Sequence, residues 1–135
     1  MYISYVPILG DLLHYGHYKI IRQAKLNSKV LVCGVLSDKV SNSIWGKPIS
    51  NFNERKSIIS SITYVDKVIV QDSTSPEKNL IYLKKQFPRY KIRYFHGNLS
   101  KEFLNYDLLK KYNVEIVKIA HYKKLSRENI QNYFV

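Results

Sequence analysis

The sequence contains one cysteine, Cys33, among its 135 residues. A single cysteine excludes an internal disulfide framework and a cysteine-based zinc cluster. Long apolar runs are also missing, because the longest are the size of a strand and a membrane-spanning helix needs about 20 residues. Residues 1–5 show neither the basic nor the long apolar region of a signal peptide. We therefore expect a soluble, cytoplasmic protein that does not insert into a membrane.

Acidic residues are few. The chain carries 22 Lys and Arg against 10 Asp and Glu, a formal net charge of +12, and 45% of its residues are hydrophobic. It is apolar enough to bury a core, and its length fits one domain over residues 1–135. The positive charge favours phosphate-bearing partners, which include nucleic acid, anionic lipid and small phosphorylated substrates. The sequence signatures of nucleic-acid-binding modules are absent, so we do not expect a nucleic-acid partner.

Strand and helix patterns alternate along the chain. Strands are expected at residues 2–9, 29–36, 67–70, 91–96 and 114–120, and helices at 11–25, 37–45, 53–64, 75–87, 100–112 and 126–133. Such alternation is typical of an α/β fold in which helices cover both faces of a parallel sheet. The sequence thus predicts a single Rossmann-like, doubly wound domain with a five-stranded parallel sheet.

Some local expectations follow from the same patterns. Residues 29–36 are nearly all apolar, which indicates a strand buried on both faces of the sheet. Ile58, Ile59 and Ile62 are expected to face the core from their helix. Ser75 is expected as a helix N-cap, with Pro76 at the first helical position.

The most informative motif follows the first predicted strand, where ligands bind in doubly wound folds. It reads Asp11-Leu-Leu-His14-Tyr-Gly16-His17. The two histidines are three residues apart at the predicted start of a helix, and Gly16 leaves room for a close approach. A helix N-terminus suits a phosphate, and two imidazoles can donate hydrogen bonds to charge that develops on phosphate oxygens.

The histidines allow two other interpretations. The pair has a spacing that suits metal ligands, but no third ligand is evident nearby and a zinc site needs at least three. They can also be two unconnected histidines. The sequence has four histidines in all, and two of them flank this one glycine, which favours a shared role.

The motif resembles the signature of the HxGH nucleotidyltransferase superfamily. Residues 53–56 (Asn-Glu-Arg-Lys) and 64–69 (Tyr-Val-Asp-Lys-Val-Ile) are similar to segments of small bacterial cytidylyltransferases, including the glycerol-3-phosphate cytidylyltransferases. Residues 34–39 and 95–97 look closer to cytidylyltransferases that activate phosphonates such as 2-aminoethylphosphonate. The resemblance covers nearly the whole chain and implies a nucleotidyltransferase fold of the HxGH type.

The resemblance also implies an activity. An oxygen of a small phosphate or phosphonate acceptor would attack the α-phosphorus of CTP, and pyrophosphate would leave. By the match, His14, His17 and Lys47 are the catalytic residues and contact the triphosphate, while Asp11 orients its loop or helps to hold Mg²⁺. A homodimer is expected on the same ground. The implied nucleotide-binding residues are Leu9, Gly10, Asp11, Gly16, Arg55, Gly97, Asn98, Ser126 and Arg127.

Three segments depart from the family pattern. Residues 97–99 lack an acidic residue, residues 121–124 lack an arginine, and Arg127 stands where the family has a hydroxyl. Two alternatives stay open. One is an HxGH adenylyltransferase that uses ATP, because such enzymes have a similar spacing from Lys47-Pro48-Ile49 to Arg55. The other is a non-catalytic nucleotide-binding relative, which the altered segments allow. The acceptor is also open, although activated products of this kind commonly supply the synthesis of cell-surface polymers.

Overall fold

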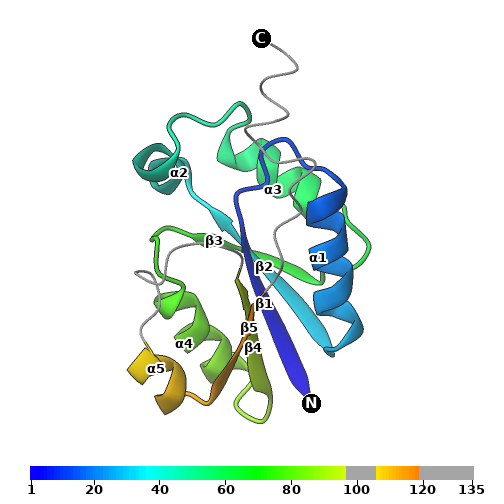
Figure 1. Cartoon of the computed structure of the whole chain (residues 1–135), viewed down its shortest axis with the longest axis vertical. Coiled ribbons are helices and arrows are strands. Elements are labelled where there is room, and N and C mark those ends of the chain that lie inside the picture. The colour runs from blue at the N-terminus through cyan, green and yellow to red at the C-terminus, as the bar shows by residue number, and fades with distance from the viewer. Residues whose placement is uncertain (97–105, 119–135) are drawn as a thin grey trace.

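The computed structural model describes residues 1–96 and 106–118 (Figure 1). Strands and helices alternate over these residues, as predicted. The strands are β1 (Tyr2–Ile8), β2 (Val30–Leu36), β3 (Lys67–Gln71), β4 (Lys91–His96) and β5 (Val114–Lys118). The helices are α1 (Tyr15–Leu26), α2 (Asp38–Ile44), α3 (Phe52–Ser60), α4 (Glu77–Gln86) and α5 (Tyr106–Lys111).

The five strands form one parallel sheet in the order β3-β2-β1-β4-β5. This confirms the predicted five-stranded parallel sheet of a Rossmann-like α/β fold. The chain starts at the central strand, adds β2 and β3 on one side, and then crosses to add β4 and β5 on the other. The order therefore reverses beside β1, and the carboxyl end of β1 is where this class of fold binds ligands.

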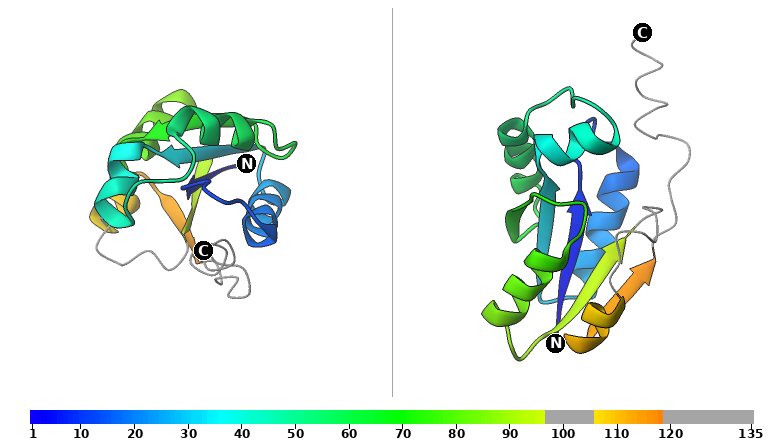
Figure 2. Two further views of the ribbon diagram at one scale, coloured as in Figure 1. Left: turned by 90° about the horizontal axis from the view of Figure 1, so that it is seen from above. Right: turned by 90° about the vertical axis from the view of Figure 1, so that its left-hand side faces the viewer.

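Helices cover both faces of the sheet (Figure 1). Ile21 and Ala24 of α1 and Ile59 of α3 join one buried cluster with residues of β1 and β2. Leu80 and Leu83 of α4 belong to the cluster on the opposite face. Figure 2 shows α2 at the end of the sheet away from the N-terminus, which is the end where the parallel strands finish.

The second strand is buried from Leu31 to Leu36, as its apolar run predicted. Burial raises the pKa of the Cys33 thiol to about 12. The nucleophilic form of cysteine is the thiolate, so this cysteine is an inert core residue at neutral pH.

A buried polar network links β1 to β3 and α4, on the face of the sheet that α4 covers. The Tyr5 hydroxyl donates to Gln71 Oε1 at 2.5 Å and accepts from Asn79 Nδ2 at 2.9 Å. Gly34 of β2 lies against this phenol, and a Cβ there would overlap the Tyr5 hydroxyl. Burial raises the pKa of Tyr5 far above its usual value, so the phenol stays neutral. The network fixes β1, the end of β3 and the first turns of α4 relative to one another.

Two predicted helix starts differ from the structure. The first helix begins at Tyr15 and not at Asp11, because the residues before it form a tight turn. Pro76 is the N-cap of α4 in place of Ser75, although the Ser75 hydroxyl still accepts from the Glu77 N–H at 3.2 Å.

The prediction that Ile58 faces the core was wrong, because its side chain is 48% exposed. The inward face of α3 is set instead by Arg55 and Ile59, which are four residues apart and fully buried. The predicted helix 126–133, residues 100–105 of another helix and the last two residues of strand 114–120 lie outside the described residues. Within the described ranges, no helix combines the length and the apolar character needed to cross a membrane.

Candidate active site

The two motif histidines form the cap of α1. His14 is the N-cap with an extended backbone, and its Nδ1 accepts from the Gly16 N–H at 3.0 Å. The His17 Nδ1 accepts in return from the His14 N–H at 3.2 Å. This is a reciprocal capping box built from two histidines, where serine or threonine and glutamate usually serve. The imidazole centroids are 4.2 Å apart, so the cap places both rings at the helix N-terminus.

The cap also selects the tautomer of each ring. A ring nitrogen that accepts a hydrogen bond carries no proton, so the proton of each neutral imidazole is on Nε2. His14 and His17 thus present N–H donors from their Nε2 atoms, next to the positive end of the α1 dipole. The arrangement suits a ligand with several negatively charged oxygens.

The turn between β1 and α1 depends on Gly10. Its φ of +78° lies in the left-handed region that favours glycine, and a Cβ there would overlap the Ile59 side chain. Leu12 also has a positive φ of +54°. The predicted binding residues Leu9, Gly10 and Asp11 thus form a tightly constrained connection directly after the central strand.

The Asp11 carboxylate holds a loop. Its side chain is buried, its Oδ2 accepts from the Ile49 N–H at 2.9 Å, and its Oδ1 accepts from the Ser50 N–H at 3.0 Å. Both oxygens therefore bind the backbone of residues 46–51, the loop that carries Lys47. The sequence led us to expect that Asp11 orients its own loop or helps to hold Mg²⁺, and these contacts show it holding the 46–51 loop instead. Its binding of Mg²⁺ stays a prediction.

Arg55 lies beneath the site. It is fully buried, and its Nη1 donates at 2.7 Å to the carbonyl oxygens of both Leu9 and Leu36. Its Nε donates to the Ser50 carbonyl at 3.0 Å, and its Nη2 pairs with Asp38 Oδ1 at 2.6 Å. One guanidinium thus joins the ends of β1 and β2 to the loop and to α2. The sequence predicted an arginine that lines a nucleotide pocket. In the structure Arg55 is buried beneath the strand ends and the loop, and it does not line the pocket described below.

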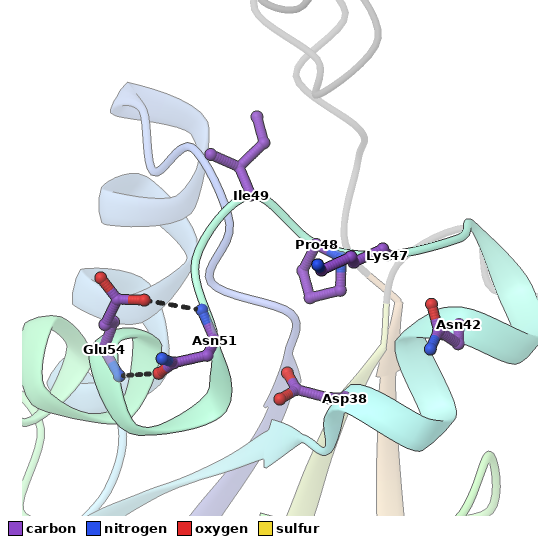
Figure 3. A pocket seen from close by; sticks show the side chains of 7 residues that line it. All are labelled: Asp38, Asn42, Lys47, Pro48, Ile49, Asn51 and Glu54. Atoms are coloured by element: carbon purple, nitrogen blue, oxygen red, sulfur yellow. Dashed lines mark hydrogen bonds between the residues drawn. The ribbon is translucent and has the colours of Figure 1, made fainter.

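Lys47 is exposed and stands at a pocket with a volume of about 360 Å³ (Figure 3). The pocket lies between α2, the 46–51 loop and the start of α3. Asp38 lines it from the start of α2, opposite the loop that bears Lys47. Its lining residues are Asp38, Asn42, Lys47, Pro48, Ile49, Asn51 and Glu54.

No group of three His, Cys, Asp or Glu side chains that could hold a metal occurs within residues 1–96 and 106–118. A metal bound mainly by protein side chains therefore does not fit this part of the chain. Mg²⁺ commonly binds through substrate phosphates and water with few protein ligands, and the described residues are compatible with that arrangement only.

The structure thus brings His14, His17, Gly16 and Asp11 together at the end of β1, with Lys47 on the loop that Asp11 holds. The predicted binding residues Gly97, Asn98, Ser126 and Arg127 lie outside the described residues. Asp38 was not predicted, although an acidic residue in the first turn of a helix is a recognisable signal. The role of the Ser50 backbone has no sequence signal.

Replacing Asp11 with asparagine is expected to loosen the 46–51 loop. An amide offers one acceptor oxygen in place of two, so at least one loop N–H loses its partner, at a cost of about 1–3 kcal/mol. We expect the melting temperature to fall by about 3–10 °C. Amide exchange at Ile49 and Ser50 should accelerate. The same change at the exposed Asp107 serves as a control and should leave both readouts almost unchanged. Equal effects at the two positions would contradict this role of Asp11.

Comparison with known proteins agrees with the resemblance noted from the motifs. The sequence profile of the cytidylyltransferase-like family matches residues 11–131. The ethanolamine-phosphate cytidylyltransferase of Arabidopsis thaliana is 34% identical over 89 residues, which cover 65% of this chain and 21% of that protein. The glycerol-3-phosphate cytidylyltransferase of Bacillus subtilis (strain 168) is 38% identical over 69 residues, which cover 51% of this chain and 49% of that protein. The chain thus spans about a fifth of the first relative and about half of the second.

Solved structures agree on the fold. A lipopolysaccharide core biosynthesis protein from Thermoplasma volcanium GSS1 superposes with a TM-score of 0.72 and 26% identity. That superposition covers 90% of this chain and 98% of the other. The pantothenate synthetase from Thermus thermophilus shares the fold alone, with a TM-score of 0.56 and 13% identity over 96% of this chain and 64% of that one.

Proposed function

The chain belongs to the cytidylyltransferase-like family, whose profile covers residues 11–131, and on this premise we propose that it transfers CMP from CTP to a small acceptor. The acceptor would carry a phosphate or a phosphonate. One of its oxygens would form a bond to the α-phosphorus of CTP while the bond to pyrophosphate breaks. The observation that supports this proposal best is the double-histidine cap of α1 at the end of the central strand.

The chemistry asked of the protein is positioning and charge stabilisation. Negative charge shifts onto the pyrophosphate oxygens as the α-phosphorus is transferred, and fixed donors aimed at those oxygens lower the barrier. In this proposal the Nε2–H groups of His14 and His17 donate to the triphosphate from the positive end of α1. Lys47 supplies a mobile ammonium from the opposite loop. Mg²⁺ that arrives with the nucleotide would neutralise part of the triphosphate charge.

Two of the relatives are named for ethanolamine phosphate and glycerol 3-phosphate, and both compounds are small phosphate esters. We propose that the acceptor belongs to this chemical class or is a phosphonate of similar size. The expected homodimer stays a prediction.

Nucleotide preference is tested by thermal stability with CTP, ATP, GTP and UTP, each with and without Mg²⁺. A ligand that binds the folded state at 100 times its Kd stabilises it by about 2.7 kcal/mol. For a chain of this size, that raises the melting temperature by about 8–10 °C. We expect this shift with CTP and a much smaller one with UTP, which differs only in the base.

Other results would overturn parts of the proposal. A shift with ATP alone would indicate an adenylyltransferase. No shift with any nucleotide, in protein that melts cooperatively, would favour a relative that has lost its site.

A further inference from the structure

Two serines in α2 behave differently. The Ser43 hydroxyl donates to the Val40 carbonyl at 2.7 Å, which is the usual backward bond of a helical serine. The Ser41 hydroxyl instead donates forward, at 3.1 Å, to the carbonyl of Gly46, which lies beyond the end of the helix. Ser41 is fully buried, whereas Ser43 is exposed.

The Ser41 backbone also binds the residues that end α2. Its carbonyl accepts from the Trp45 N–H at 2.8 Å and from the Gly46 N–H at 3.1 Å. Gly46 has a φ of +99°, in the left-handed region, and among the described residues beyond its chain neighbours no atom lies within 4 Å of where its Cβ would be. The glycine is therefore needed for its conformation and not for space. Ser41 binds both the N–H and the carbonyl of Gly46, the residue that directly precedes Lys47.

Buried side chains also bind the other end of the 46–51 loop. Asp11 accepts from the N–H groups of Ile49 and Ser50, and Arg55 donates to the Ser50 carbonyl. Lys47 thus stands between two anchors, and the Pro48 that follows it has a fixed φ. Buried groups set the position of its backbone, while its side chain stays exposed.

We propose that Ser41 is a positioning residue that acts through Lys47, by fixing the backbone from which Lys47 reaches the nucleotide. The inference rests on the proposed function, because it requires Lys47 to contact the triphosphate. A misplaced lysine loses its contact mainly where the geometry is most demanding, which is the transition state. Loss of the Ser41 hydroxyl should therefore lower kcat more than it raises the KM for CTP.

The test is a double-mutant cycle of Ser41→Ala and Lys47→Ala, with Ser43→Ala as the matched control. We expect Ser41→Ala to lower kcat about tenfold, with the KM for CTP within about twofold, since small misplacements of a catalytic group can cost up to about a hundredfold. Ser43→Ala should leave both constants within about twofold of the wild type. In the Lys47→Ala background, Ser41→Ala should have almost no further effect, because the group through which it acts is gone.

Ser41→Cys tests whether lost packing, and not the lost hydroxyl, lowers kcat in Ser41→Ala. A cysteine fills almost the same space and is a weak donor, so its kcat should also fall while its melting temperature stays near that of the wild type. Rate losses that multiply in the cycle would overturn the proposal, and so would a normal kcat in Ser41→Ala. If Lys47→Ala alone is fully active, the proposal also fails, while the proposed function stands as long as the wild type forms a product. If the wild type binds no nucleotide, the proposed function itself fails.

Discussion

Replacing Arg55 with methionine is expected to lower the melting temperature by about 10–20 °C. The change removes the donors that serve the carbonyls of Leu9, Leu36 and Ser50, and it removes the ion-pair partner of Asp38. Buried acceptors left unsatisfied cost about 1–3 kcal/mol each, and we expect a total of about 3–5 kcal/mol. At about 3–4 °C for each kcal/mol in a chain of this size, this gives the expected shift. Thermal unfolding followed by circular dichroism measures it.

Lys56 provides the matched control, because it follows Arg55 on the same helix and is exposed. Lys56→Met should change the free energy of unfolding by less than about 0.5 kcal/mol. An Arg55→Met protein that melts near the wild type would show that the guanidinium does not hold the loop and the strand ends together. An Arg55→Lys protein should recover only part of the loss, because an ammonium cannot reproduce the planar fork of donors.

Removing the two imidazoles is expected to abolish most of the activity without unfolding the helix. His14→Asn keeps a favourable N-cap, and His17→Gln keeps a side chain that can reach back to the His14 N–H. Each single variant should lower kcat about 10²–10³-fold, the usual cost of losing one donor to a charged transition state. Steady-state rates of pyrophosphate release measure this loss. The melting temperature should stay within a few degrees of the wild type.

His14→Ala separates capping from catalysis. It should lose the same activity as His14→Asn, and it should also lose about 1 kcal/mol of stability, because alanine cannot cap. If His14→Asn were as active as the wild type, the histidine would be a cap and not a catalytic residue.

The sequence predicts the sheet and the place of the site because both depend on local patterns. Residues 29–36 are apolar almost throughout and form β2, buried as expected. The motif from Asp11 to His17 directly follows β1, and in parallel α/β sheets ligands bind beyond the carboxyl ends of the strands. The start of α1 was misplaced because capping by histidine is unusual, and its motif gives no standard helix-start signal.

The contacts that organise the site could not be read from the sequence. Arg55 joins three carbonyls from separate segments, and a carbonyl has no residue type that a pattern can reveal. A helical arginine in a chain with a charge of +12 looks like a surface or ligand residue, and its burial follows only from the packing of α3 on the sheet. Asp11 was recognised as part of the motif, but its partners at Ile49 and Ser50 are 38 and 39 residues away.

The most direct test of CMP transfer is to detect its products. The wild type is incubated with CTP, Mg²⁺ and a panel of glycerol 3-phosphate, phosphoethanolamine, phosphocholine and 2-aminoethylphosphonate. Phosphorus NMR then follows each mixture, with the His14→Asn, His17→Gln double variant as the control. We predict that pyrophosphate and a cytidine diphosphate ester, or its phosphonate counterpart, appear together with one of these acceptors and are nearly absent with the double variant. The absence of any product from a wild type that binds CTP, or equal product from the double variant, would contradict the account.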